Sequence, residues 1–507
     1  MKPTVKQSGR LSWGKRACVA FVLCAMTTMS LAAQTFTTLF SFDGMNGDGP
    51  TDGLIQATNG DLYGTTGAGG ANPGFFGGGG GTIFRIAPSG TLTTLYSFCS
   101  LSGCTDGFGP NGELIQATNG YLYGITMYGG AGDDCSDTLS CGTVFKMTSS
   151  GTLTTLYSFC SESNCPDGAE PFDGLVQPPN GEFYGTTYAG GAYGYGSVFE
   201  ITPSGTRTTL YSFCSQGQPC KDGFGPSAGL VRAANGDLYG TTSYDGANGN
   251  GGTVFKITPS GTLTTLYSFC SQAGCTDGLS PYARLVEATN GDLYGTTVFG
   301  GTNVLGTVFK ITPSGTLTTL YSFCSRASCA DGYYPYAELV QATDGNLYGT
   351  TEYGGANKQG TVFRITPSGT LTTLYSFCSE SGCTDGGSPF GGLVQDTSGV
   401  LYGTTELGGA SVTCYQGCGT IFRLSVGLGP FVETQTPSGS VGTAVKILGT
   451  GLTGATSVTF SGASAAFTVV SPSEIKTAVP AGATTGTVKV GTPSGTLSSN
   501  GPFRVLP

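Results

Sequence analysis

A segment that recurs seven times decides most of what this chain can fold into. The tripeptide Leu-Tyr-Gly, or Phe-Tyr-Gly in one copy, recurs at steps of 60, 61, 55, 55, 54 and 54 residues. Its tyrosines are Tyr63, Tyr123, Tyr184, Tyr239, Tyr294, Tyr348 and Tyr402. A run like Gly-Thr-Val-Phe and a run like Thr-Leu-Thr-Thr-Leu-Tyr-Ser-Phe also recur seven times. Repetition at this period indicates a propeller, a solenoid or another repeat architecture.

Each copy has the pattern of four short strands. In the fifth copy we expect strands at Leu285–Thr289, Asp292–Thr297, Thr307–Thr312 and Thr316–Phe323. An Asn-Gly pair separates the first two strands, and Pro-Ser-Gly separates the last two. Both are tight turns, because Asn and Gly tolerate positive φ and Pro fixes its own φ. A variable loop joins the second strand to the third.

Four antiparallel strands per copy favour a seven-bladed propeller over a β-solenoid, whose repeats are usually shorter. The repeats open with an isolated strand of the fourth type, Thr35–Phe42, and end with one of the third type, Thr420–Leu424. We therefore expect the first strand to complete the last blade beside Phe422 and close the ring, which removes exposed sheet edges. The predicted propeller spans residues 35–427.

Residues 1–33 have the pattern of an export signal. Five basic residues precede an apolar stretch from Ala17 to about Met26, and small residues follow. The stretch is too short to span a bilayer, which needs about 20 residues. We expect cleavage, secretion to the extracellular space or cell surface, and no membrane span afterwards.

The cysteines of the exported chain fall into eight close pairs. An even number of cysteines in an exported protein indicates disulfides. The chain has no histidine and the pairs lack C-x-x-C spacing, so zinc is a poor fit and we expect no metal site. The predicted disulfides are Cys99–Cys104, Cys135–Cys141, Cys160–Cys165, Cys214–Cys220, Cys270–Cys275, Cys324–Cys329, Cys378–Cys383 and Cys414–Cys418.

All eight pairs lie in connections that share one end of an up-and-down sheet. These are the loops between the second and third strands and those that lead to the next copy. The Asn-Gly and Pro-Ser-Gly turns belong to the other end. One rim of the ring should therefore be long, variable and stapled by disulfides, and recognition usually resides in such loops on a rigid scaffold.

The stapled loops are followed by a repeated Asp-Gly-x-x-Pro motif. Its aspartates are Asp106, Asp167, Asp222, Asp277, Asp331 and Asp385. They could ligate calcium, or they could accept hydrogen bonds that hold a turn. A residue repeated in every blade favours the structural role.

Residues that differ between blades are better ligand candidates. Aromatic side chains next to the motif prolines include Phe172, Tyr282, Tyr334, Tyr336 and Phe390. They could stack on sugar rings or pack between neighbouring loops, and both interpretations stay open. Glu113, Asp173, Arg284 and Glu338 enter the first strands from the same rim, near the predicted axis, and could supply polar contacts.

Several function classes have little support. The absence of histidine excludes a His-based triad, and no glycine-rich segment has the context of a phosphate loop. Without the signal, 16 Lys and Arg stand against 31 Asp and Glu, a net charge of −15. This charge argues against nucleic acid as a partner. We expect no cofactor.

The pattern changes from about Pro430. Short alternating segments such as Val445–Thr450, Ser457–Phe460 and Gly486–Val490 predict a small β-sandwich over residues 430–507. This segment resembles the IPT/TIG domain, an immunoglobulin-like module. The resemblance implies a spacer or adhesion role.

The segments NGDLYGTT, GTVFKITPSG and TLTTLYSF resemble the GloVer (Gloeo–Verruco) tandem repeat of exported bacterial proteins. The resemblance covers Thr35 to about Val426. It implies no activity and no catalytic residues.

These observations favour a non-catalytic exported binding or adhesion protein. Its ligand, a glycan or a surface protein, would lie on the stapled rim. The alternatives are an enzyme that acts on extracellular polysaccharide through carboxylates at the centre of the ring, and a purely structural envelope protein.

Overall fold

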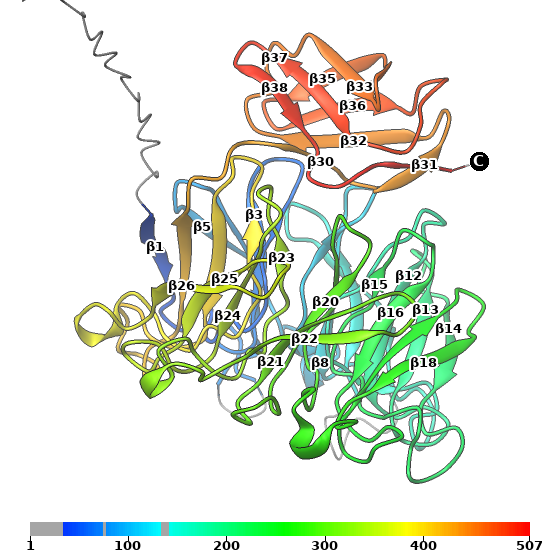
Figure 1. Ribbon diagram of the computed structural model, residues 1–507, viewed down its shortest axis with the longest axis vertical. Helices are drawn as coiled ribbons and strands as arrows, with labels where there is room; N and C mark the ends of the chain where they lie inside the picture. The colour runs from blue at the N-terminus through cyan, green and yellow to red at the C-terminus, as the bar shows by residue number, and fades with distance from the viewer. Residues whose placement is uncertain (1–33, 75–77, 133–140, 507) are drawn as a thin grey trace, which may run out of the picture.

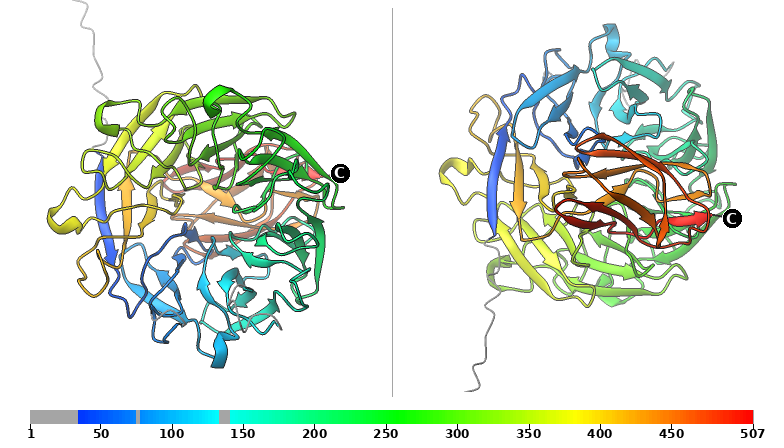
Figure 2. Two further views of the ribbon diagram at one scale, coloured as in Figure 1. Left: turned by 90° about the horizontal axis from the view of Figure 1, so that it is seen from below. Right: turned by 90° about the horizontal axis from the view of Figure 1, so that it is seen from above.

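The computed structural model describes residues 34–74, 78–132 and 141–506. The predicted export signal, residues 1–33, lies outside this part. Before residue 430, the described residues form seven antiparallel sheets arranged as blades around a central axis (Figures 1 and 2). The prediction of an all-β propeller followed by an immunoglobulin-like sandwich is confirmed.

Each blade comprises four strands in order from the axis outward, and the second blade has an additional short strand, β6 (Phe108–Pro110). In the third blade, the first strand is the counterpart of β6, and the innermost pairing is an isolated bridge between Val176 and Tyr184. The first three blades are β2 (Ile55–Gln56), β3 (Leu62–Thr66), β4 (Thr82–Ile86), β5 (Leu92–Ser97); β7 (Ile115–Gln116), β8 (Leu122–Tyr128), β9 (Thr143–Met147), β10 (Leu153–Ser158); and β11 (Ala169–Pro171), β12 (Phe183–Ala189), β13 (Ser197–Ile201), β14 (Arg207–Ser212).

The next three blades are β15 (Val231–Arg232), β16 (Leu238–Thr242), β17 (Thr253–Ile257), β18 (Leu263–Ser268); β19 (Val286–Glu287), β20 (Leu293–Thr297), β21 (Thr307–Ile311), β22 (Leu317–Ser322); and β23 (Val340–Gln341), β24 (Leu347–Thr351), β25 (Thr361–Ile365), β26 (Leu371–Ser376). The seventh is β27 (Val394–Gln395), β28 (Leu401–Thr405), β29 (Thr420–Ser425) and β1 (Thr35–Ser41). The innermost strands are shorter than the sequence predicts, mostly two residues.

The fifth blade shows why the repeated residues form these strands. Gly295 pairs with Phe309 on the neighbouring strand. A Cβ atom on Gly295 would lie 2.7 Å from both the Phe309 ring and the Leu285 side chain, so only glycine lets them pack there. The neighbouring Tyr294 is buried, and its hydroxyl accepts a hydrogen bond from Asn290 Nδ2 at 3.1 Å.

The hydrophobic core lies between blades. One cluster combines Tyr294, Val308 and Phe323 of the fifth blade with Leu339 and Phe363 of the sixth. Each such side chain contributes roughly 1.5–3 kcal/mol when it is fully buried. The blades therefore stabilise one another around the ring, and none has a separate core.

The ring closes through the first strand, as predicted. Strand β1 pairs antiparallel with β29, with Thr38 opposite Phe422. The Phe36 ring stacks on Tyr375 of the sixth blade, with centroids 3.7 Å apart. At the other side of the seventh blade, where it meets the first, Gln56 Oε1 accepts a hydrogen bond from the Thr397 backbone N–H at 2.9 Å.

The disulfides lie in the predicted loops, and the rim that these loops form is called the stapled rim below. Within the described residues, seven of the eight predicted pairs are joined; the eighth involves Cys135, which lies outside them. Four 3-10 turns end at a disulfide cysteine: η1 (Ser102–Cys104), η2 (Ala273–Cys275), η3 (Ala327–Cys329) and η4 (Ser381–Cys383).

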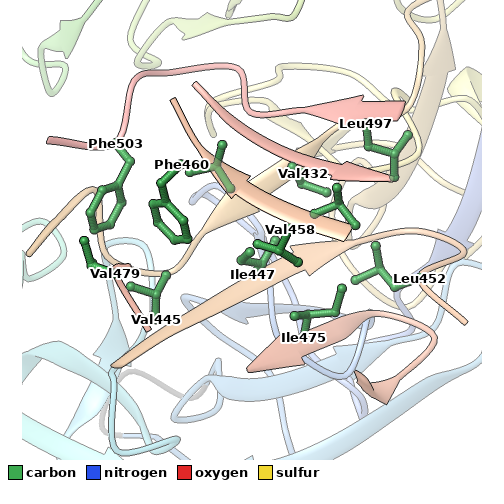
Figure 3. Close-up of a cluster of buried hydrophobic side chains, with 12 residues drawn as sticks. Val432, Val445, Ile447, Leu452, Val458, Phe460, Ile475, Val479, Leu497 and Phe503 are labelled. Carbon is green, nitrogen blue, oxygen red and sulfur yellow. The ribbon is translucent and has the colours of Figure 1, made fainter. Parts of the chain in front are cut away.

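Residues 432–506 form the C-terminal sandwich. One sheet contains β30 (Val432–Thr434), β32 (Ala444–Gly449), β36 (Glu474–Ala478) and β35 (Phe467–Ser471). The other contains β34 (Ala463–Ser464), β33 (Ser457–Phe460), β37 (Val488–Thr492) and β38 (Gly495–Ser498). A parallel pair, β31 (Ser438–Ser440) and β39 (Arg504–Leu506), completes it. Figure 3 shows the core between the sheets, with Ile447, Val458 and Phe460 at its centre.

The sandwich covers the end of the ring opposite the stapled rim (Figures 1 and 2). It contacts the Asn-Gly-type turns of several blades, which we call the hairpin rim. Gln435 donates to the carbonyl oxygens of Gln116 and Ala117, and Asn500 Nδ2 donates to the Gln341 carbonyl at 2.8 Å. Ser473 and Lys446 donate to two more turn carbonyls. In the described part of the chain, no helix is long and apolar enough to cross a membrane.

Candidate functional site

One five-residue segment of the repeat carries residues that differ from blade to blade. It runs from the motif proline to the leucine that precedes the innermost strand. The seven copies are Pro50–Leu54, Pro110–Leu114, Pro171–Leu175, Pro226–Leu230, Pro281–Leu285, Pro335–Leu339 and Pro389–Leu393. Because each copy enters the ring beside the axis, equivalent side chains from distant parts of the chain meet there.

The third and fourth residues of this segment form a charged cluster on the axis. Arg284 lies at its centre. Its Nη1 lies 3.1 Å from Glu113 Oε2, its Nη2 lies 3.2 Å from Asp173 Oδ1, and its Nε lies 3.7 Å from Glu338 Oε2. The structure therefore brings together all four polar residues that the sequence placed near the axis.

Two glycines at the same repeat positions make room for this guanidinium. A Cβ atom on Gly174 would lie 2.8 Å from Arg284 Nη2, and one on Gly229 would lie 2.8 Å from the same atom. The Gly229 backbone N–H also donates to Asp173 Oδ2 at 2.6 Å. The glycines of the third and fourth blades thus leave the space that the Arg284 side chain of the fifth blade occupies.

The charged side chains are largely enclosed, with exposed fractions of 16% for Arg284 and 22–24% for its three partners. Burial raises the pKa of Glu113 well above its usual range, and the charge of Glu338 raises it further while Arg284 opposes the shift. Burial also raises the pKa of Glu338. Burial alone would lower the pKa of Arg284, but the three carboxylates outweigh it and raise that pKa.

Asp52 is a member of this site that the sequence interpretation missed. Its pKa is raised to about 7, mainly by burial; the hydrogen bonds from the Gly112 N–H and from Thr65 oppose the shift, and the charges of Asp173 and Glu338 contribute to it. Thr65 Oγ1 donates to Asp52 Oδ2 at 3.3 Å. Repeat register could have found this residue, because Asp52 and Asp173 occupy the same position after their prolines.

Aromatic rings surround the cluster on the stapled side. The residue after the motif proline is Phe172, Tyr282, Tyr336 or Phe390 in four of the blades, and all four rings are half-buried. Tyr336 stacks on Phe390 with centroids 4.6 Å apart, and Tyr282 meets Tyr336 edge to face at 5.8 Å. The Tyr282 and Tyr244 hydroxyls are hydrogen-bonded at 2.6 Å.

Rings and charges line one cavity of about 110 Å³, which we call the axial funnel. Its side chains are those of Thr51, Asp52, Asn111, Glu113, Phe172, Asp173, Ser227, Tyr282, Arg284, Tyr336, Glu338 and Phe390. Six of the seven ligand candidates predicted from the sequence are among them.

Tyr334 is the predicted candidate that lies elsewhere. Its ring packs against Phe299 at 5.1 Å, Tyr333 at 4.9 Å and Tyr353 at 6.2 Å. It does not line the funnel. For this residue, packing between neighbouring loops is the observed arrangement.

A chamber lies on the other side of the charged cluster, between the ring and the C-terminal sandwich. It has two lobes of about 470 and 430 Å³, and Glu113 and Arg284 line both. Glu433 of the sandwich also lines both lobes. The Glu433 side chain is accessible to solvent inside the chamber. The protein that surrounds the chamber nevertheless reduces its hydration, and this burial raises the pKa of Glu433. The charged cluster therefore separates the funnel from the chamber.

The repeated aspartates of the stapled loops act as scaffold. Asp277 is buried, and its Oδ2 accepts hydrogen bonds from the Tyr267 hydroxyl at 2.8 Å and from the Ser271 N–H and hydroxyl at 2.9 Å. Its counterparts make the same contacts to tyrosine and serine. Among the described residues, Asp48, Cys414 and Cys418 are the only three potential metal ligands that lie close together, and those cysteines form a disulfide.

Two family patterns match the sequence. The Gloeobacter/Verrucomicrobia repeat matches residues 25–164, 136–276 and 272–465, and the IPT/TIG domain matches residues 430–505. No curated protein matches the chain.

Solved structures resemble the chain at low identity. The periplasmic gluconolactonase of Pseudomonas aeruginosa is 18% identical over 64% of this chain and 84% of its own, with a TM-score of 0.42. A protein assigned as a 6-phosphogluconolactonase from Bacteroides uniformis is 16% identical over 72% of this chain and 99% of its own, with a TM-score of 0.41. The extracellular domain of a protein assigned as a hybrid two-component system from B. thetaiotaomicron is 11% identical over 94% of this chain and 60% of its own, with a TM-score of 0.46.

Proposed function

The chain belongs to the family of Gloeobacter/Verrucomicrobia repeat proteins, and we propose that it is an exported binding protein whose ligand occupies the axial funnel. One observation carries the proposal. The segment that lines the funnel differs in residue type from blade to blade at a constant length, whereas the strands and hairpin turns of the repeat are nearly uniform. Equivalent positions of the seven blades are under the same structural constraints. Residues that differ between blades at such a position are therefore candidates for ligand binding.

Export is supported by the disulfides. Seven are joined among the described residues, and disulfides persist in oxidising compartments such as the periplasm and the extracellular space. This agrees with the signal predicted over residues 1–33. We propose that the mature protein acts outside the cytoplasm.

A glycan is the ligand class that we favour. Half-buried rings such as Tyr282, Tyr336 and Phe390 offer apolar faces for a sugar ring, and the adjoining carboxylates accept hydrogen bonds from its hydroxyl groups. The IPT/TIG-type sandwich closes the opposite face of the ring, so the ligand enters from the stapled rim. In this proposal the sandwich is a fixed support rather than a flexible spacer.

A glycan-array screen tests the proposal. We expect the purified protein to bind at least one class of extracellular glycan, and the Tyr336→Ala variant to lose that binding. Tyr334→Ala is the matched control, because it removes a tyrosine from the same rim but outside the funnel. Tyr336→Phe keeps the ring and should keep most of the binding. Equal binding by the wild type and both alanine variants would contradict the proposal.

An enzyme acting on polysaccharide is the second candidate. The observation that favours it is Asp52, because a carboxyl group with a pKa of about 7 is partly protonated at neutral pH and can act as a general acid. Glu338 is a weaker candidate for that role, since it is paired with Arg284 at 3.7 Å. Release of reducing ends from a bound polysaccharide, abolished in Asp52→Asn, would establish the enzyme. If the protein showed neither glycan binding nor polysaccharide turnover, a purely structural role in the envelope would remain.

A further inference from the structure

The axial funnel has more carboxyl groups than cations. Its wall contains the carboxyl groups of Asp52, Glu113, Asp173 and Glu338, and Arg284 is the one cation among the described residues that line it. Arg284 lies within ion-pair distance of three of the four. One guanidinium therefore faces four carboxyl groups. Burial and mutual repulsion raise the pKa values of Asp52, Glu113 and Glu338, so a further cation in the funnel would favour the ionised form of these groups.

The carboxyl groups that outnumber Arg284 lie where water screens charge poorly. The exposed fractions of Arg284 and its partners are between 16% and 24%. Like charges in such surroundings repel one another more strongly than they do at an open surface. A positively charged group that entered the funnel would relieve this repulsion, whereas an anionic group would add to it.

The mouth of the funnel adds a second feature, which is independent of the carboxyl groups. The rings of Phe172, Tyr282, Tyr336 and Phe390 line the same cavity and are half-buried. The face of an aromatic ring attracts an organic cation, and aromatic walls are used in proteins to bind quaternary ammonium ligands. Rings around carboxylates thus complement an ammonium group attached to a carbon skeleton.

The arrangement does not suit a small metal ion. Within the described residues, no three carboxylate oxygens of the funnel lie close enough together to ligate one ion; the group that does, Asp48 with Cys414 and Cys418, lies elsewhere. A cavity of about 110 Å³ also has room for the carbon atoms next to a charged nitrogen.

We infer that the axial funnel recognises a protonated amine, carried either by an amino sugar or by a small aliphatic polyamine, between its carboxylates and its four rings. This inference rests on the proposed function and names the charge of the ligand. The amine takes the place of the missing cation beside Asp52 and Asp173. The rings pack on the carbon atoms that bear the amine.

Isothermal titration calorimetry of the purified protein at neutral pH provides the test, with three probes. They are glucosamine oligomers, N-acetylglucosamine oligomers of the same length, and pentane-1,5-diamine. The second differs from the first by the acetyl group on each nitrogen, which removes the charge of the amine and adds a small neutral amide, and the third carries the charge without a sugar. We expect the glucosamine oligomers to bind at least about tenfold more tightly than the acetylated ones, since charge-assisted hydrogen bonds are stronger than neutral ones.

Two variants locate the charge effect. Asp52→Asn should weaken glucosamine binding by about tenfold, as expected when one charge-assisted contact is lost. Asp52 makes no ion pair with the described residues, so this change disturbs the cluster least. Glu162→Gln is the control, because it removes one negative charge from an exposed loop of the same rim. Its affinity should equal that of the wild type.

The outcomes separate the inference from the proposed function. Equal binding of both oligomers would overturn the inference and leave the glycan proposal standing. Binding of the diamine alone would support the inference and contradict the glycan proposal. Absence of binding by all three probes, or unchanged glucosamine affinity in Asp52→Asn, would overturn the inference.

Discussion

Arg284 bonds Asp173 at 3.2 Å across the axis of the ring, although 111 residues separate them in the sequence. Arg284 enters from the fifth blade and Asp173 from the third. The contact forms because both occupy the same segment of their repeats, where the chain turns into the innermost strand. Repetition therefore places variable residues together without any local sequence signal that pairs them.

The first prediction concerns this guanidinium. Arg284→Met leaves the neighbouring carboxylates without their cation, and removal of one partner of a buried ion pair costs about 3–5 kcal/mol. We expect urea denaturation to show a free energy of unfolding lower by about 3 kcal/mol at neutral pH. The deficit should shrink in mild acid, because burial and mutual repulsion raise the pKa values of Glu113 and Glu338 and these groups then take up protons.

Lys310→Met is the matched control for that variant. Lys310 pairs with Asp292 at 3.6 Å on the hairpin rim, with exposed fractions of 32% and 20%. Such a surface pair is worth less than about 1 kcal/mol. Similar losses in the two variants would contradict the view that Arg284 holds the axial cluster together.

The second prediction is a pH dependence caused by Asp52. The folded protein retains the Asp52 proton up to about pH 7, whereas the unfolded chain releases it near the ordinary pKa of 3.8. Between these values the unfolded state holds fewer protons, so rising pH favours unfolding, by up to about 1.4 kcal/mol for each pH unit. Asp52→Asn removes this ionisation.

Thermal denaturation at a series of pH values checks the effect. The Asp52→Asn variant should melt at a higher temperature than the wild type above pH 7, and the difference should fade toward pH 4. The Glu162→Gln control should follow the wild-type curve. Parallel curves for the wild type and Asp52→Asn would show that Asp52 does not titrate in this range.

The architecture could be predicted well from the sequence because the same pattern of strands and turns recurs seven times. Strand positions, ring closure through β1 and the unequal rims all follow from the spacing of one pattern. The innermost strands are shorter than predicted mainly at their hairpin end. In the fifth blade, Ala288 and Thr289 belong to the hairpin turn, and Leu285 lies just before the strand.

The site could be predicted only in part. Residues with distinctive types, such as Arg284 and Tyr336, stand out against the other copies, whereas Asp52 is found only by comparing registers. The Tyr334 ring could not be assigned, because loop packing depends on Phe299 from the fifth blade and Tyr353 from the sixth. Glu433 could not be predicted at all, since nothing in the sequence says that the sandwich covers the axis.

The third prediction tests ring closure. Phe36 stacks on Tyr375 and lies 5.4 Å from the Phe422 ring, so Phe36→Ala removes contacts on both sides of the junction. A half-buried phenylalanine should contribute about 2 kcal/mol, less than the 3–5 kcal/mol of a fully buried one. Urea denaturation measures this loss. Tyr415→Ala is the control, since Tyr415 is 89% exposed and its loss should change stability by less than about 0.5 kcal/mol.

The fourth prediction separates scaffold from ligand at the repeated aspartates. Asp277 accepts hydrogen bonds from Tyr267 and Ser271, so Asp277→Ala leaves partly buried donors without an acceptor. Each unsatisfied buried group costs about 1–3 kcal/mol, and we expect a loss of about 2 kcal/mol in urea denaturation. Tyr267→Phe removes one of the same hydrogen bonds and should account for about half of the loss.

If these aspartates instead held calcium, a chelator would lower the melting temperature of the wild type. We expect chelation to leave it unchanged, because Oδ2 of each of these aspartates already accepts a hydrogen bond from a tyrosine hydroxyl of its repeat.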